Sequence, residues 1–116
     1  MRRDWEVIKA ILKAAEELED PQGYLKPEDF PAWAPELVAY QMKLLIQAGL
    51  VEGNCSKAMN RGPYCFVYGL TWEGHEFLDL VRERSFWNRI VKTARERGLE
   101  LSFEAIKAMA RFLIGA

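Results

Sequence analysis

Apolar residues dominate residues 35–51, whose sequence is PELVAYQMKLLIQAGLV. On a helical wheel that turns by about 100° per residue, apolar side chains leave only one narrow polar face. That face carries Glu36, Tyr40, Lys43 and Gln47. A helix this apolar is buried on most sides and keeps one stripe for water or a partner. Gly49 predicts the end of the helix, because glycine adopts the left-handed conformation at little cost, and an extended segment follows.

Hydrophobic patterns predict further elements on both sides of this central helix. Apolar residues at helical spacing predict a helix over residues 3–19, and two strands are predicted over residues 50–55 and 64–70, the second from its period-two alternation. Three more helices are predicted over residues 72–84, over residues 86–97 and after residue 102, with caps at Thr71, Ser85 and Ser102. The first of these three has an expected apolar side formed by Trp72, His75, Phe77, Leu78 and Val81.

Two residues inside the predicted helices have expected structural roles. Gly74 is a poor helix former, which costs roughly 1 kcal/mol against alanine, so we expect it to allow close approach to a neighbouring backbone. Gln41 points inward on the wheel of the central helix, and a buried amide without partners costs about 1–3 kcal/mol. We therefore expect Gln41 to form hydrogen bonds with the backbone of the proline-rich connection that precedes its helix.

That connection, residues 21–35, contains Pro21, Pro27, Pro31 and Pro35. Residues before proline are disfavoured in helical conformation, so no long helix can run through it, and residues 27–34 allow at most one irregular turn. Tyr24 and Leu25 could add a short edge strand. The supporting helix of a full helix-turn-helix is thus predicted to be shortened or missing.

The order of these elements predicts a mainly α fold with a small β-hairpin, as in a winged helix with added C-terminal helices. A helix followed at once by a hairpin is how a winged helix presents its recognition helix and its wing. Because the chain has 116 residues, we expect one domain over residues 1–116. Residues 1–71 would form the core with the wing, and residues 72–116 the helical extension.

Composition narrows the chemistry that is expected. The chain has two cysteines and one histidine, fewer ligands than a zinc site needs, so we expect no metal and no cofactor. Pairing the two strands about Asn60 would place Cys55 opposite Cys65, and we expect two small apolar residues there, reduced in the cytoplasm. No signal peptide or membrane-spanning run is recognisable, which favours a cytoplasmic protein with no membrane partner.

Several segments together resemble one uncharacterised family. The segments are residues 1–4 (MRRD), 38–45 (VAYQMKLL), 70–79 (LTWEGHEFLD) and 86–88 (FWN), and residues 70–79 are the most specific. They are similar to the bacterial and phage domain-of-unknown-function family numbered 2513, whose members tend to carry histidine where this chain has Gln41. The resemblance implies a small winged-helix-like protein, often associated with phages or mobile elements. It implies no catalytic residues.

Double-stranded DNA is the first expected partner. Tyr40, Lys43 and Gln47 are residue types that contact phosphates and bases, while Lys57 and Arg61 lie near the predicted wing tip. The formal net charge of −1 argues against strong nonspecific binding, because phosphate neutralisation supplies much of the affinity of DNA-binding proteins. The alternative interpretation of the polar stripe is a solvated face on a structural helix.

Protein association is the second expectation. The helices after Thr71 exceed what a minimal winged helix needs, and Trp87, Met109 and Phe112 are predicted to contribute to a homodimer interface. A non-enzymatic adaptor that binds another protein is the alternative function. Catalysis is not expected, because the only histidine, His75, lies beside Trp72 and Phe77, and no phosphate loop or nucleophile elbow is present. No small-molecule substrate is evident.

Overall fold

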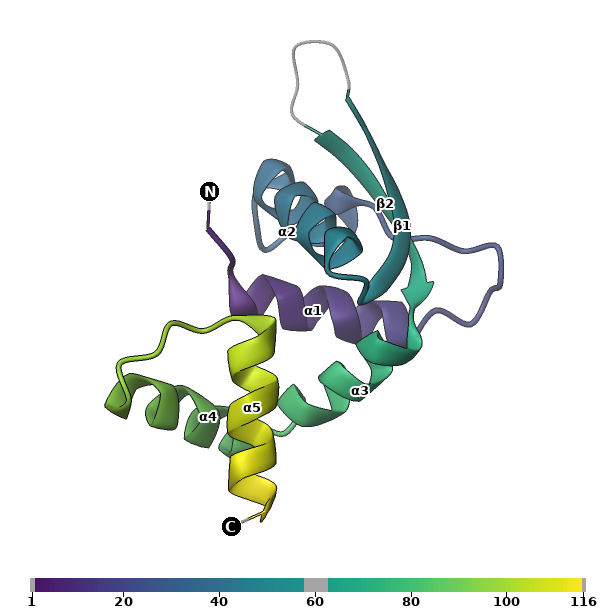
Figure 1. The fold of residues 1–116 in the computed structure, drawn as a ribbon. Helices are drawn as coiled ribbons and strands as arrows, with labels where there is room; N and C mark the ends of the chain where they lie inside the picture. The colour runs from purple at the N-terminus through teal and green to yellow at the C-terminus, as the bar shows by residue number, and fades with distance from the viewer. Residues whose placement is uncertain (1, 58–62, 116) are drawn as a thin grey trace. The chain divides into compact units, whose positions relative to one another are not determined.

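The computed structural model describes residues 2–57 and 63–115, with the backbone alone at Pro63. It is mainly α-helical and has one antiparallel β-hairpin, as the hydrophobic patterns predict (Figure 1). Its elements are α1 (Trp5–Glu16), a 3-10 turn η1 (Pro27–Asp29), α2 (Pro35–Gln47), β1 (Val51–Lys57), β2 (Pro63–Leu70), α3 (Trp72–Val81), α4 (Arg84–Glu96) and α5 (Phe103–Gly115).

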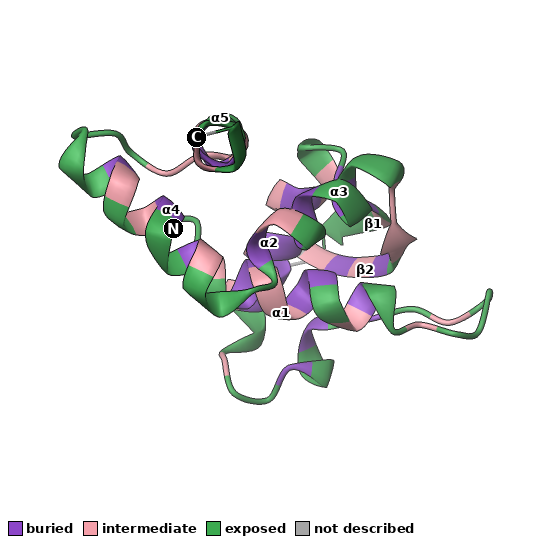
Figure 2. Cartoon of the chain, turned by 90° about the horizontal axis from the view of Figure 1, so that it is seen from below, coloured by how far each residue is buried: buried purple, intermediate pink, exposed green. Residues whose placement is uncertain are grey.

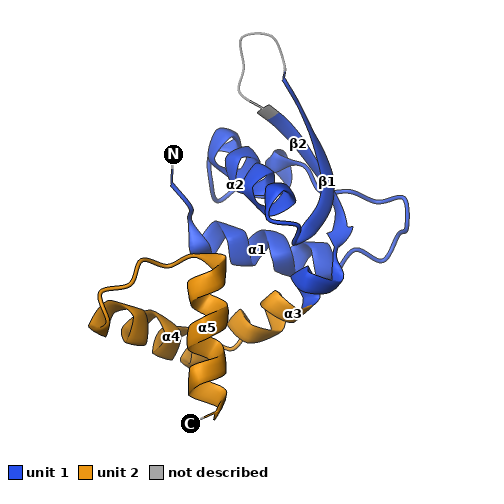
Figure 3. Ribbon diagram, viewed as in Figure 1, with its two compact units in different colours: residues 1–75 blue, residues 76–116 orange. Residues whose placement is uncertain are grey.

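The chain divides into two compact units (Figure 3). Unit 1 comprises residues 1–75, and unit 2 comprises residues 76–116. The boundary falls inside α3, four residues after the division that was predicted at Thr71. Unit 1 therefore contains the central helix and the hairpin, and unit 2 contains the C-terminal helices.

The core of unit 1 forms between α1 and α2. The inward face of α1 is fully buried at Val7, Ile8, Ile11 and Leu12, and α2 contributes Val38, Ala39, Met42 and Leu45 (Figure 2). The carboxylate of Asp4 caps α1 by accepting hydrogen bonds from the backbone N–H groups of Glu6 and Val7 at 3.1 and 3.3 Å. The helix ends at Glu16, three residues before its predicted end, ahead of Pro21.

The helical structure in the proline-rich connection, all of whose residues are described, is limited to the short turn η1, as the four prolines predict. Leu25 forms an isolated antiparallel bridge with Val67, with backbone N···O distances of 2.7 and 2.9 Å. The connection therefore contributes a single bridge at Leu25 in place of the short edge strand suggested for Tyr24 and Leu25. In the described residues between α1 and α2 there is no further α-helix, so the supporting helix of a helix-turn-helix is missing.

The hairpin pairs Cys55 with Cys65 across the two strands, in the predicted register. The expectation of two free thiols is wrong, because a disulfide joins these cysteines. Directly opposed residues bring their Cβ atoms close enough for a disulfide to form. The pairing shifts by one residue between Glu52 and Gly53, which marks a β-bulge.

The junction between α2, the hairpin and α3 depends on two glycines and a threonine. Gly49 ends α2 with a φ of 76°, as predicted. The hydroxyl of Thr71 donates to the carbonyl of Gly49 at 2.6 Å and accepts from the backbone N–H of Gly74 at 3.0 Å, so it caps α3. An added Cβ at Gly74 would lie 1.9 Å from the carbonyl oxygen of Leu50, which confirms the predicted close approach of backbones.

Two residues that were predicted on the apolar side of α3 lie outside it. Trp72 is 74% exposed, and His75 is exposed as well. The first turn of α3 approaches the backbone of Leu50 through Gly74, which turns the side chains of its neighbours toward solvent. Phe77, Leu78 and Val81 are buried, as expected.

In unit 2, α4 and α5 pack against each other, and Phe77 meets Phe103 edge-to-face with ring centroids 5.1 Å apart. The cap of α4 is Glu83, whose carboxylate accepts from the backbone N–H groups of Ser85 and Phe86 at 3.2 and 3.1 Å. The prediction that Ser85 caps this helix is therefore wrong. Ser102 caps α5 through the N–H of Ala105, as predicted.

Candidate nucleic-acid interface

The outward side of α2 carries the predicted polar stripe. Gln47 and Glu36 are exposed, and Tyr40 and Lys43 are half-buried. All four lie within an arc of about 60° on the helical wheel, so one approaching surface could contact them together. The sequence pattern therefore placed these side chains correctly on one accessible side of α2.

The accessible side is wider than the polar stripe alone. Leu37 and Leu44 are half-buried, and Ala48 is exposed, all at angles adjacent to Tyr40 on the wheel. The prediction that apolar residues at these positions are buried is therefore wrong for Ala48 and only partly correct for Leu37 and Leu44. The wheel alone could not reveal this, because it shows which residues are apolar but not how many sides of a helix are covered.

The orientation of α2 is fixed by a polar anchor on its buried side. Gln41 is fully buried; its amide nitrogen donates to the carbonyl of Arg2, and its oxygen accepts from the N–H of Asp4, both at 2.9 Å. The predicted burial and backbone bonding are confirmed, but the partner is the N-terminal segment rather than the proline-rich connection. The side of α2 that carries Gln41 faces the start of α1, so this segment lies within reach of the amide.

This anchor also positions two cations. Arg2 and Arg3 are exposed in the segment that Gln41 holds against α2, and the guanidinium of Arg3 lies 5.7 Å from the ring centroid of Trp5. Glu36 is the acidic residue on the outward stripe of α2 itself.

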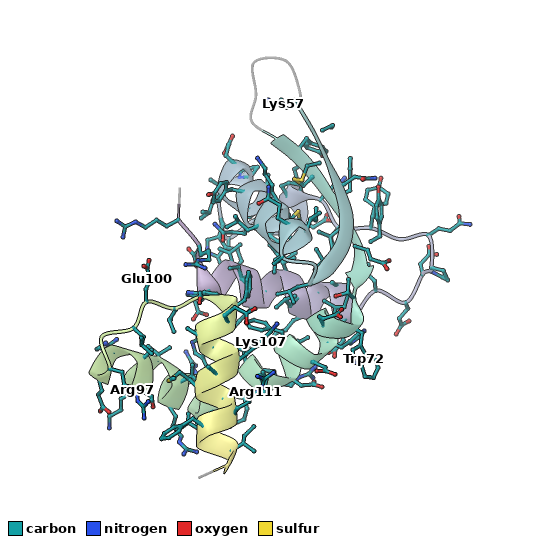
Figure 4. All side chains as sticks on the ribbon, viewed as in Figure 1. Lys57, Trp72, Arg97, Glu100, Lys107 and Arg111 are labelled. Carbon is teal, nitrogen blue, oxygen red and sulfur yellow. A yellow bond between two sulfur atoms is a disulfide. The ribbon has the colours of Figure 1, made fainter. Side chains whose placement is uncertain are left out.

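The hairpin contributes one described candidate. Lys57 is exposed at the end of β1, where it points away from the packed part of unit 1 (Figure 4). Arg61, the other predicted wing residue, lies outside the described residues. Of the two cations predicted near the wing tip, the structure therefore places Lys57 alone.

One face of β2 carries aromatic side chains. The ring of Phe66 lies edge-to-face with Tyr24 and Tyr64, at centroid distances of 5.2 and 5.0 Å. The hydroxyl of Tyr64 donates to the carboxylate of Glu28 at 2.8 Å, and this hydrogen bond raises the pKa of Tyr64. Since Glu28 and its neighbour Asp29 are exposed acids, this face of the hairpin is unfavourable for contact with phosphates.

The residues predicted for a dimer interface separate into two groups. Trp87 and Met109 are buried within unit 2, where α4 and α5 turn them toward the interior, so they are not available to a second copy. Phe112 is 50% exposed, and the guanidinium of Arg97 lies 4.5 Å from its ring centroid. The helical spacing of Trp87 and Met109 correctly indicated an apolar face, but its partner is the same chain.

Neither a group of metal ligands nor a membrane-spanning helix is found in the described residues. Across residues 2–57 and 63–115, no group of three or more histidine, cysteine or acidic side chains could hold a metal ion. No described helix is both long enough and apolar enough to cross a bilayer. The only histidine of the chain, His75, is exposed on α3.

Comparison with known proteins assigns the chain to a family. The family described as "Hypothetical protein (DUF2513)" matches residues 2–100. An "Uncharacterized protein" of Haemophilus influenzae (strain ATCC 51907 / DSM 11121 / KW20 / Rd) is 37% identical over 114 residues, which cover 98% of this chain and 96% of that protein. No solved structure matches. The chain belongs to the DUF2513 family.

Proposed function

We propose that this member of the DUF2513 family binds double-stranded DNA through the outward side of α2. The observation that carries the proposal is the division of α2 into two sides. Its inner side is held by the apolar core and by Gln41, while Tyr40, Lys43 and Gln47 are presented together beside a hairpin. A rigidly held helix with polar side chains on one accessible face, next to a two-stranded projection, has the form of a recognition helix with a wing.

The dimensions of α2 suit the major groove. Its 13 residues span about 20 Å at 1.5 Å per residue, and the groove of B-DNA, about 12 Å wide, admits an α-helix. Lys43 can donate to guanine O6 or N7, and Gln47 can pair with both N6 and N7 of adenine. Tyr40 would lie toward the major groove with them, while Lys57 and Arg61 would contact flanking phosphates, which position the protein but carry no sequence information.

Binding of this kind should be weak to moderate and only mildly dependent on salt. The chain has a net charge of −1, and each phosphate neutralised adds about 0.9 to the slope of log K against log salt. A DNA-binding regulator of a bacterium, phage or mobile element would act in the cytoplasm. Thiols are kept reduced there, so Cys55 and Cys65 would be exposed to reductants. DNA binding should therefore be measured both with and without reductant.

Fluorescence anisotropy with labelled operator-like duplexes across a salt series tests the proposal. Lys57→Ala and Arg61→Ala should each reduce the salt slope by about 0.9, whatever the DNA sequence. Lys43→Ala or Gln47→Ala should instead change the ratio of affinities between sequences. Lys13→Ala, which removes an exposed cation from α1, is the matched control and should leave both quantities unchanged.

The DNA proposal fails if the wild-type protein does not bind at low salt, or if charge reversal at Lys57 and Arg61 together leaves binding unchanged. A second function is then favoured by a separate observation. Trp72, Tyr24 and Tyr68 on unit 1 are large and exposed, as are Phe112 and Ile114 on unit 2. Aromatic residues of this kind often anchor protein interfaces.

The second candidate is thus a non-enzymatic adaptor that binds a second copy or another protein. Light scattering at high micromolar concentration tests the homodimer. A dimer that Phe112→Ser converts to a monomer would support association through the exposed end of α5. A wild-type monomer at that concentration would exclude the homodimer.

A further inference from the structure

Positive charge is concentrated in residues 82–97. This segment contains six basic and two acidic residues, whereas the other 100 residues contain ten basic and fifteen acidic ones. The overall charge of −1 therefore conceals a cationic segment in an otherwise acidic chain. The segment includes all of α4.

Three of the four cations of α4 lie on one side of the helix. Its apolar side is buried at Trp87, Ile90 and Ala94, where α4 packs in unit 2 (Figure 2). On the opposite side, spacings of four, eight and eleven residues place four exposed side chains within an arc of about 80°. These side chains, which we call the α4 basic face, are Arg84, Asn88, Lys92 and Arg95.

Two of these cations have no charged partner among the residues that the structure describes. Within the part of the chain that the structure describes, neither Arg84 nor Arg95 forms an ion pair. Lys92 lies 4.0 Å from the carboxylate of Glu96, with both side chains largely exposed, a geometry that contributes little binding energy. Unpaired guanidinium groups on a rigid helix are free to make bidentate hydrogen bonds with phosphate.

We propose that the α4 basic face binds backbone phosphates of double-stranded DNA. This inference rests on the proposed function and adds to it a second contact surface, on unit 2. The first and last cations are 11 residues apart, or about 16 Å along the helix. That length lets the face contact several phosphates of a duplex, which carries one charge per about 1.7 Å of its axis.

A lipid surface suits this helix less well than DNA does. An interfacial helix must bury its apolar side in the membrane, but the apolar side of α4 is already buried by its own unit. Phosphate contacts from α4 would also explain how a chain with few cations on α2 and the hairpin could hold a duplex. They carry no sequence information, so they would strengthen binding to every sequence equally.

The test compares two double variants that remove equal charge from the same unit. Arg84→Gln with Arg95→Gln removes two of the three cations of the α4 basic face, and Lys107→Gln with Arg111→Gln removes two cations of α5 (Figure 4). Anisotropy is measured with a 24-base-pair duplex of mixed sequence between 50 and 200 mM salt. The loss of two phosphate contacts should lower the salt slope by about 1.8. Between 50 and 200 mM salt, the affinity of the wild type should therefore fall about twelve-fold more than the affinity of the variant.

The α5 control should retain the wild-type slope. Equal slope losses in both double variants would overturn the inference, because they would indicate a long-range charge effect. An unchanged slope in the α4 variant, with wild-type DNA binding intact, would overturn it and leave the proposed function standing. Absence of wild-type DNA binding would instead refute the proposed function, and the inference with it.

Two further measurements complete the experiment. Vesicles of 70% phosphatidylcholine and 30% phosphatidylglycerol provide an anionic lipid surface. The assignment to DNA would be contradicted if the α4 double variant loses binding to these vesicles but keeps the wild-type salt slope for DNA. Thermal unfolding checks that the variants fold. If the double variant is unfolded, Lys92→Gln alone should lower the slope by about 0.9, and no change in it would overturn the inference.

Discussion

Replacing Gly74 by alanine should destabilise the protein, although alanine is the better helix former. The added Cβ would lie 1.9 Å from the carbonyl oxygen of Leu50, about 1.1 Å closer than the 3.0 Å that real Cβ contacts essentially never fall below. This carbonyl cannot move away freely, because it accepts a hydrogen bond from the N–H of Thr71 at 3.1 Å and Leu50 is buried. Relief of the clash must separate α3 from the start of the hairpin.

The magnitude follows from three contributions. Overpacking costs about 1–3 kcal/mol, and weakening the hydrogen bond from Thr71 to Leu50 costs about 1 kcal/mol more. The higher helix propensity of alanine returns about 1 kcal/mol. The net destabilisation should be about 1–3 kcal/mol, which lowers the melting temperature by roughly 4 °C for each kcal/mol.

Gly115→Ala is a suitable control, since Gly115 is also helical but an added Cβ there meets nothing within 4 Å. Thermal and urea unfolding, followed by circular dichroism, should show the loss at Gly74 and almost no change at Gly115. If Gly74→Ala is as stable as the wild type or more so, the close approach between α3 and Leu50 is not a feature of the folded protein.

Three more predictions concern single interactions. Gln41→Leu removes both hydrogen bonds to the N-terminal segment and should cost about 1–3 kcal/mol in urea unfolding; an unchanged midpoint would contradict the anchor. The hydroxyl of Ser85 and two backbone N–H groups lower the pKa of Glu83 below 4.5, so its capping contribution should be present above pH 4.5 and lost as the pH falls further. Glu83→Gln should flatten this acid dependence of stability. If the variant and the wild type lose stability equally as the pH falls, the capping role of Glu83 is refuted. Reducing the Cys55–Cys65 disulfide should cost at most about 3 kcal/mol, and Cys55→Ser should abolish the effect of reductant on the unfolding midpoint.

The sequence predicted the elements well where a local signal determined them. Gly49 has a positive φ and ends α2 as predicted, and the alternation in residues 64–70 correctly identified β2 as a strand. These features depend on residues that are close together in the chain. They need no knowledge of tertiary structure.

Predictions failed where the sequence allowed two local arrangements. Glu83 and Ser85 can each cap α4, and the spacing of residues alone does not decide which carboxylate or hydroxyl lies nearer the free N–H groups. The cysteines were recognised as opposed residues, but their oxidation state is not encoded in strand alternation.

Burial was the harder property to predict in the candidate sites. The apolar residues Trp87 and Met109 face the interior of unit 2, whereas Trp72 faces solvent, and periodicity alone does not distinguish these environments. The formal net charge of −1 does not reveal the α4 basic face, because the acidic residues outside residues 82–97 offset its cations. Counting charges along single predicted helices would have revealed it.

The most direct test of DNA recognition by α2 is an NMR titration of the 15N-labelled protein with a 24-base-pair duplex. We predict that the backbone amides and side-chain signals of Tyr40, Lys43 and Gln47 shift progressively, together with Lys57. Signals from Glu28 and Asp29, on the acidic side of the hairpin, should stay unchanged. Shifts confined to other elements, with α2 unaffected at saturating DNA, would contradict the account.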